Sequence, residues 1–191
     1  MDIILASASP RRKELLDQIG VSFKVIPSKV DENFDMLKGT IESKVEELAY
    51  IKAKEVAQKV NKGLILGADT IVVIDEEILG KPLNDEDAFN MLSRLSGREH
   101  KVITGIALID VDNNRHRVTH ESTKVIFDTL TKERIIEYIK TGEPNGKAGA
   151  YAIQGRAAVF VKKIEGCYFN VVGLPISKVN SILKEFGIDV L

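Results

Sequence analysis

The feature that most constrains the fold is the run Leu64–Ile74, in which apolar and β-branched residues surround one aspartate. Such a run is typical of a buried β-strand. Asp69 interrupts it after two small residues, which leave room for a ligand or another backbone to approach. An ionised carboxylate inside a buried strand is costly unless it is paired or binds a metal. We therefore expect Asp69 to be catalytic or metal-binding. The alternative is an aspartate hydrogen-bonded at a β-bulge.

The segments around this strand predict an α/β fold with a mixed, partly antiparallel sheet and flanking helices. A strict Rossmann domain would keep alternating strand and helix and would carry a glycine fingerprint, which this chain lacks. No linker separates independent domains, so we expect residues 1–191 to form a single domain. The expected strands are Asp2–Ala6, Ser22–Pro27, Leu64–Ile74, His100–Ile109, Arg115–Phe127 and Ala158–Ile164, with a short return strand ending at Gly80–Pro82. The expected helices are Pro10–Ile19, Ile41–Val60, Asp85–Ser96 after the cap Asn84, Thr131–Thr141 and Pro175–Phe186.

Composition excludes several classes of protein. Hydrophobic residues make up 44% and charged residues 29% of the 191 positions, which is ordinary for a globular protein. The formal net charge of -1 argues against binding to nucleic acid polymers or anionic membranes. No apolar run approaches the ~20 residues that a membrane span needs. The single cysteine, Cys167, and the absence of a signal peptide favour the cytoplasm.

The turn after the first strand, Ser7–Lys13, predicts a phosphate-binding site. Ser9 suits the N-cap of the following helix, where its side-chain oxygen would accept a backbone N–H, and Pro10 suits the first helical position. Arg11 and Arg12 then lie in the first helical turn, where the helix dipole disfavours cations unless an anion binds between them. Arginine side chains match phosphate oxygens in bidentate fashion. The alternative is a solvated basic patch.

Two lysines are further candidates for phosphate binding. On the expected helix Ile41–Val60, Lys52 falls near the middle of the apolar face. It must therefore meet an anion, or extend along that face until its ammonium reaches solvent. Lys81 lies between Gly80 and Pro82, which would present it rigidly near the end of the β-hairpin. Gly-Lys-Pro alone is a weak signal.

Glu32 and Gln154 complete the candidate site. Glu32 supplies a second carboxylate in a loop after a strand; the alternative is a solvated loop acid. Gln154, in the segment Ala150–Gly155, offers a two-sided amide, the chemistry needed to read the edge of a base. The alternative is an ordinary turn glutamine. With the arginines, the lysines and Asp69, these residues suit a nucleoside triphosphate and a divalent cation. The chain has no Ser-His-Asp or Cys-His arrangement that would favour acyl transfer.

Several separated motifs resemble, in their joint order, those of the Maf family of nucleoside triphosphate pyrophosphatases. No single motif is specific, but together they cover essentially the whole chain. They are Ser7-Ala8-Ser9-Pro10-Arg11-Arg12, Asp31-Glu32, Ala49-x-x-Lys52-Ala53, Gly67-Ala68-Asp69-Thr70, Gly80-Lys81-Pro82, Ser96-Gly97-x-x-His100, Thr104-Gly105, Lys147-Ala148-Gly149-x-Tyr151, Ile153-Gln154-Gly155, Gly166 and Asn170-Val171-x-Gly173-Leu174-Pro175.

The resemblance implies an α/β fold with a long curved sheet and a deep cleft between two lobes, similar to the inosine triphosphate pyrophosphatases. It implies cleavage of the α–β phosphoanhydride to a nucleoside monophosphate and pyrophosphate, with Mg²⁺ or Mn²⁺ as cofactor. By resemblance, Asp69 is the proton acceptor, and Arg12, Thr70 and Gln154 select the base. Thr70 and the Ile-Gln-Gly motif are similar to the branch that acts on dTTP and UTP rather than on 7-methyl-GTP. Gly146 departs from the aspartate that many relatives carry.

The combined expectation is that a triphosphate lies along Ser7–Arg12, with Lys52 and Lys81 neutralising its charge and with Asp69 and Glu32 holding the metal. Asp69 would also take a proton from the attacking water, and the sequence leaves open whether it is base, metal ligand or both. Two other functions stay open. One is a nucleotide-sensing module that regulates septum formation and cell division, and the other is a house-cleaning enzyme for modified pyrimidine nucleotides. The sequence does not give the oligomeric state, so a homodimer also stays open.

Overall fold

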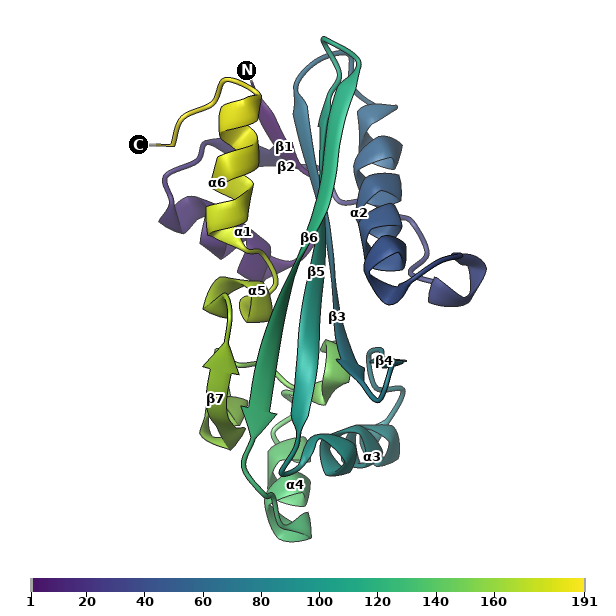
Figure 1. The fold of residues 1–191 in the computed structure, drawn as a ribbon, viewed down its shortest axis with the longest axis vertical. Coiled ribbons are helices and arrows are strands. Elements are labelled where there is room, and N and C mark those ends of the chain that lie inside the picture. The colour runs from purple at the N-terminus through teal and green to yellow at the C-terminus, as the bar shows by residue number, and fades with distance from the viewer. Residues whose placement is uncertain (1, 191) are drawn as a thin grey trace. The chain divides into compact units, whose positions relative to one another are not determined.

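The computed structural model describes residues 2–190, which form a mixed α/β fold around a seven-stranded sheet (Figure 1). The strand order is β2-β1-β3-β5-β6-β7, and β4 pairs with β3 outside this path. β1 runs parallel to β2 and β3, whereas the pairs β3–β4 and β6–β7 are antiparallel. The sequence-based prediction of a mixed sheet with flanking helices is confirmed.

The predicted elements occur in the expected order along the chain, and a further short α-helix lies just before the last one. The strands are β1 (Ile3–Leu5), β2 (Phe23–Val25), β3 (Leu64–Ile74), β4 (Glu77–Leu79), β5 (Glu99–Asp110), β6 (Arg115–Phe127) and β7 (Val161–Glu165). The α-helices are α1 (Pro10–Gln18), α2 (Ile41–Ala57), α3 (Asp85–Leu95), α4 (Lys132–Ile139), α5 (Tyr168–Val172) and α6 (Ile176–Glu185). Short 3-10 helices are η1 (Phe34–Met36), η2 (Ala148–Ala150) and η3 (Arg156–Phe160). Among residues 2–190, no helix is long and apolar enough to cross a bilayer.

Two local predictions are wrong. Ser9 occupies the N-cap position of α1, but its side chain makes no capping hydrogen bond. Instead the backbone N–H of Ser9 donates to the Oγ of Ser7 at 3.2 Å. The strand predicted at Ala158–Ile164 begins only at Val161, because the preceding residues form η3.

The described residues divide into two compact units. The first unit comprises residues 2–70, 104–121 and 173–190, and the second comprises residues 71–103 and 122–172. The division falls within β3, β5 and β6. The single domain over residues 1–191 and the deep cleft between two lobes stay predictions.

In the first unit, α2 packs directly on the backbone of the sheet (Figure 1). The contact uses small side chains: a Cβ at Gly67 of β3 would lie 2.4 Å from the carbonyl oxygen of Ala49. A Cβ at Gly105 of β5 would likewise lie 2.2 Å from the carbonyl oxygen of Val45. These two glycines therefore permit an approach that any larger residue would prevent, and they bring the side chains of α2 onto β3.

In the second unit, a buried histidine lies in an aromatic cluster. His100 of β5 is 2% exposed, and its Nε2 lies 2.9 Å from the hydroxyl of Tyr151. Its ring meets the edge of Phe127 at a centroid distance of 4.9 Å. Among the described residues its Nδ1 has no hydrogen-bond partner. Burial lowers the pKa of His100 from 6.5 to about 4, so this side chain is neutral at pH 7.

The burial of neutral His100 predicts that the free energy of unfolding decreases in acid. The unfolded chain takes up a proton at His100 near pH 6.5, whereas the folded chain does so only near pH 4. The unfolded state therefore binds more protons between these values, and the free energy of unfolding falls as the pH falls, by about 3 kcal/mol for this residue. Urea denaturation at pH 7, 6, 5 and 4 measures it. His100→Gln should flatten the slope between pH 6.5 and 4, whereas His116→Gln, at an exposed histidine, should keep it. Equal slopes in all three proteins would contradict the assignment.

Candidate active site

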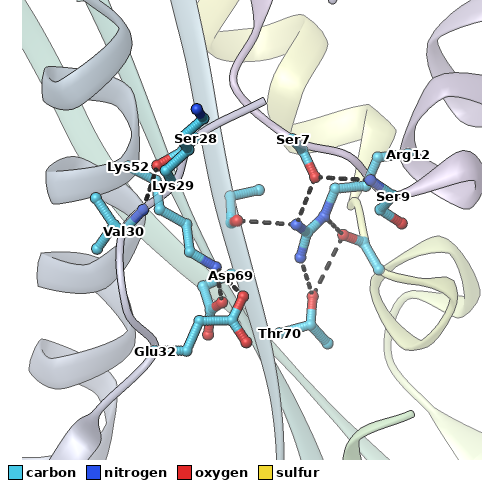
Figure 2. A network of polar contacts seen from close by, with 12 residues as sticks. Ser7, Ser9, Arg12, Ser28, Lys29, Val30, Glu32, Lys52, Asp69 and Thr70 are labelled. Carbon is cyan, nitrogen blue, oxygen red and sulfur yellow. Dashed lines mark hydrogen bonds and ion pairs between the residues drawn. The ribbon is translucent and has the colours of Figure 1, made fainter. Parts of the chain in front are cut away.

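The centre of the candidate site is a lysine held between two carboxylates (Figure 2). Lys52 of α2 places its Nζ 2.5 Å from Oδ1 of Asp69 in β3 and 2.6 Å from Oε1 of Glu32. Lys52 is 6% exposed and Asp69 is 5% exposed. The close packing of α2 on β3 at Gly67 explains why a lysine on the apolar helix face meets an aspartate in a buried strand. Lys52 does not merely extend to solvent, because its ammonium ends in this ion-pair cluster.

The cluster carries an excess of negative charge. Two carboxylates face one ammonium, so their sum is one negative charge when all three are ionised. Burial raises the pKa of Asp69 above its ordinary value, while the charges of Lys52 and Arg12 oppose the rise. A carboxylate with a raised pKa binds a proton more readily, which suits a general base near neutral pH.

Asp69 and Glu32 are the residues predicted to hold a divalent metal ion. Among the described residues, no group of three or more histidine, cysteine, aspartate or glutamate side chains could hold a metal ion by itself. Mg²⁺ is usually bound by one or two protein carboxylates together with substrate phosphates and water. Two converging carboxylates with an excess negative charge therefore fit a divalent cation that arrives with a phosphorylated substrate.

Arg12 is buried in a dense network within the first unit (Figure 2). Its Nε donates to the carbonyl oxygen of Gly173 at 2.8 Å, and one terminal nitrogen donates to Ser7 Oγ at 3.1 Å and to the carbonyl oxygen of Ala68 at 2.9 Å. The other terminal nitrogen donates to Thr70 Oγ1 at 2.9 Å. A guanidinium has five N–H groups, so four of them serve the protein. Arg12 thus joins the turn after β1 to β3 and to the segment before α6.

Arg11, the residue before Arg12, has a different environment. Arg11 is half-buried, and its guanidinium makes no hydrogen bond or ion pair to another residue within 2–190. Ser7 is 8% exposed and accepts hydrogen bonds from Ser9 and Arg12, so its own hydroxyl proton remains available for donation. In the predicted phosphate-binding turn, Arg11 and the Ser7 hydroxyl are therefore better placed than Arg12 to bind phosphate. That role is a prediction for all three.

Thr104 is a residue of this network to which the sequence analysis gave no role. It is fully buried in β5, and its Oγ1 shares a hydrogen bond of 2.9 Å with Thr70 Oγ1. Thr70 Oγ1 also donates to the carbonyl oxygen of Gly173 at 3.3 Å. The only signal in the sequence was its place in the Thr104-Gly105 motif, because a threonine in an apolar strand is common.

In the second unit, Lys81 and Gln154 lie on connected segments. Both side chains are exposed, Lys81 just after β4 and Gln154 in the turn before η3. The backbone N–H of Gly149 donates to the carbonyl oxygen of Gly80 at 3.0 Å, which ties the loop leading to Gln154 to the turn that presents Lys81. Gly149 has φ +65, and a Cβ there would lie 2.9 Å from Val72 Cγ2, so this junction requires glycine.

The structure therefore groups the predicted site residues into sets. Lys52, Asp69 and Glu32 form one cluster, and Arg12, Ser7 and Thr70 form a second network in the same unit. Lys81 and Gln154 belong to the second unit.

Comparison with known proteins gives a family profile, curated relatives and a solved structure. Residues 2–186 match the family profile described as Maf-like protein. A curated relative from Ruminiclostridium cellulolyticum, named dTTP/UTP pyrophosphatase, is 58% identical over 186 residues, which cover 97% of this chain and 96% of the relative. A relative of the same name from Desulforamulus reducens is 53% identical over 191 residues, covering 99% and 98%. A solved dITP/XTP pyrophosphatase from Mycobacterium abscessus matches at 16% identity with a TM-score of 0.44, over 68% of this chain and 76% of that one.

Proposed function

The chain belongs to the family of Maf-like proteins, and we propose that it is a nucleoside triphosphate pyrophosphatase that hydrolyses dTTP and UTP to the monophosphate and pyrophosphate. The observation that carries the proposal is the ion-pair cluster in which the buried Lys52 and Asp69 meet the exposed Glu32. The curated relatives of that name match this chain over nearly its whole length, at more than half of the aligned positions. A buried carboxylate with a raised pKa is a suitable proton acceptor for a water that attacks a phosphorus atom.

In the proposed mechanism, Asp69 orients the attacking water and accepts its proton during in-line attack on the α-phosphorus. Lys52 holds the Asp69 carboxylate in place and presents a cation to the phosphate oxygens. Arg11 and the Ser7 hydroxyl bind the phosphates along the turn after β1, and the neutralisation of phosphate charge by Lys81 stays a prediction. Fixed cations of this kind stabilise the negative charge that develops on the leaving pyrophosphate.

Asp69 and Glu32 are the residues that would hold Mg²⁺ or Mn²⁺ together with the substrate phosphates. A bound divalent cation supplies Lewis-acid polarisation of phosphoryl oxygens and lowers the pKa of a bound water. Within the chain itself, the Lys52 ammonium pairs with both carboxylates.

In this proposal Gln154 reads the base. Arg12 and Thr70, which are hydrogen-bonded to each other, contribute to base selection through that contact. The planar amide of Gln154 offers one donor and one acceptor, which match two neighbouring groups on the carbonyl, N3–H, carbonyl edge of uracil and thymine. The 5-methyl group that distinguishes thymine lies away from this edge, so one site accepts both bases. Purines need a wider pocket.

Gln154→Glu is expected to lower kcat/KM for UTP and dTTP selectively, by roughly 10- to 100-fold. The exchange removes a donor and adds a charge, and each unpaired polar contact costs on the order of 1–3 kcal/mol. The measurement is kcat/KM for UTP, dTTP, CTP, ATP and GTP in both proteins, with Mg²⁺ present. The wild type should prefer UTP and dTTP over ATP and GTP.

The matched control is Gln58→Glu, at an exposed glutamine just after α2, which should leave all five values unchanged. Equal wild-type values for purines and pyrimidines would remove the base-reading role of Gln154 while leaving the phosphate chemistry in place.

The alternative of a nucleotide-sensing module in cell division has no observation in its favour. Such a sensor needs cations for the triphosphate, but it needs no carboxylate buried in the sheet beside a lysine. A cytoplasmic location, a homodimer and action on modified pyrimidine nucleotides stay predictions.

A further inference from the structure

The turn that carries Gln154 has few backbone contacts of its own. Gln154 is exposed and lies between Tyr151 and η3. Within the turn, the N–H of Gly155 donates to the carbonyl oxygen of Ala152 at 3.0 Å. A side chain that reads a base must be held within about 0.5 Å of its productive position. The precision that base reading requires must therefore come from a contact to the rest of the second unit.

Glu143 supplies such a contact. Its Oε2 accepts a hydrogen bond from the backbone N–H of Arg156 at 2.9 Å, and its Oε1 accepts from the N–H of Ala157 at 3.4 Å. The same Oε1 accepts from the hydroxyl of Tyr138 at 2.9 Å. Hydrogen bonds to an ionised carboxylate are stronger than those between neutral groups. One carboxylate therefore ties the backbone directly after Gln154 to α4, which carries Tyr138.

Tyr138 anchors this carboxylate firmly. It is 4% exposed, and its ring packs edge-to-face against Phe160 at a centroid distance of 5.1 Å. Burial, together with the hydrogen bond to Glu143, raises the pKa of the Tyr138 hydroxyl, which stays protonated as a donor. The contact thus joins α4, Glu143 and both ends of η3 into one assembly.

Gly155 shows that the chain leaves space for the Glu143 carboxylate. A Cβ at position 155 would lie 2.2 Å from Oε1 and 2.5 Å from Oε2 of Glu143. The φ of Gly155 is -102°, which other residues adopt readily, so backbone conformation does not require glycine here. The residue directly after Gln154 is therefore small because the carboxylate passes beside it.

We propose that Glu143 is a positioning residue for base selection, because its carboxylate fixes the turn that presents Gln154 to the substrate. This inference rests on the proposed base-reading role of Gln154. It adds a residue that touches neither substrate nor metal. With Glu143 removed, the Gln154 amide moves relative to the base, and its two hydrogen bonds to uracil no longer form together. Asp69 and Lys52 make their contacts within the first unit and are not altered.

The test is the steady-state kinetics of Glu143→Gln with UTP and dTTP. Glutamine keeps the shape, but its NH₂ group faces an N–H or O–H donor where the carboxylate had an acceptor oxygen. KM is expected to rise about tenfold with kcat changed less than about twofold, the pattern of lost substrate binding. A merely structural role would lower the folded fraction, so apparent kcat would fall and KM would stay. The control is Glu137→Gln, at an exposed glutamate of α4 paired with Lys140.

A second variant disturbs the hydrogen bonds of Glu143 without changing Glu143 itself. Gly155→Ala keeps every charge but displaces the Glu143 carboxylate from the two amides, and it should raise KM in the same way. It also decides the outcome if Glu143→Gln does not fold. A wild-type preference for UTP and dTTP with KM unchanged in both variants overturns this inference alone. A wild type without that preference overturns the base-reading role of Gln154 as well.

Discussion

Replacing Asp69 by asparagine is expected to lower kcat for UTP and dTTP by at least ~100-fold, the lower range for loss of a general base. Asparagine has nearly the same shape but cannot take the proton of the attacking water. The fold should persist, because Lys52 keeps its ion pair with Glu32 and the asparagine oxygen can still accept a hydrogen bond from Lys52. Steady-state turnover and urea denaturation of the same preparations measure both effects.

Asp110→Asn is the matched control for this variant. Asp110, at the end of β5, is also fully buried. Its carboxylate accepts hydrogen bonds from Asn113 and Arg115 and is not part of the ion-pair cluster. Its replacement should lower stability and leave kcat nearly unchanged. Near-normal turnover in Asp69→Asn would remove the proposed mechanism.

Replacing Lys52 by methionine is expected to lower both turnover and stability. Methionine keeps the apolar stem but leaves the buried Asp69 carboxylate without its ammonium partner. Removing one partner of a buried ion pair typically destabilises by about 3 kcal/mol. The loss of a fixed cation from the phosphate site should reduce kcat on the order of 100-fold. The free energy of unfolding at pH 7 and kcat for UTP are the two measurements.

Two further variants separate these effects. Lys54→Met, at an exposed lysine on the same helix, should change neither quantity strongly. Asp69→Asn added to Lys52→Met should recover stability but not turnover, because it removes the unpaired buried carboxylate. If Lys52→Met were more stable than the wild type and fully active, Lys52 would be a lysine that only extends to solvent, and its assignment to the phosphate site would be wrong.

The ion-pair cluster of Lys52, Asp69 and Glu32 could be predicted from the sequence only in part. The apolar run Leu64–Ile74 gave the strand, and an aspartate inside it marked Asp69 as exceptional. The apolar face of α2 marked Lys52 in the same way. Their mutual contact depends on how closely α2 approaches β3, which Gly67 permits. Glu32 joins them from a loop 20 residues before Lys52, and no local pattern specifies where such a loop lies.

The two arginines show a second limit of local reasoning. Arg11 and Arg12 are neighbours in the first turn of α1, and the dipole argument treats them alike. The structure buries Arg12 and leaves Arg11 half-exposed. The difference arises from partners remote in sequence, since the Arg12 guanidinium donates to Gly173, 161 residues away. Sequence spacing around α1 contains no information about that contact.

The errors near Ser9 and Ala158 both involve side chains that accept backbone hydrogen bonds. At Ser9 the position of the helix cap was predicted correctly but its contact wrongly: the Ser9 side chain makes no capping hydrogen bond, and the Ser7 hydroxyl accepts the backbone N–H of Ser9. At Ala158 a strand was predicted, but the first amides of η3 donate to the carboxylate of Glu143. The first contact is local, from a residue two positions earlier, whereas the second comes from a side chain 13 residues before Arg156.

Hydrolysis of UTP and dTTP in H₂¹⁸O with Mg²⁺, followed by ³¹P NMR and mass spectrometry of the products, tests the central claim most directly. Attack of water on the α-phosphorus predicts UMP or dTMP that carries the ¹⁸O label, together with unlabelled pyrophosphate. Formation of the nucleoside diphosphate and inorganic phosphate, or saturable binding of the nucleotide without any turnover, would contradict it.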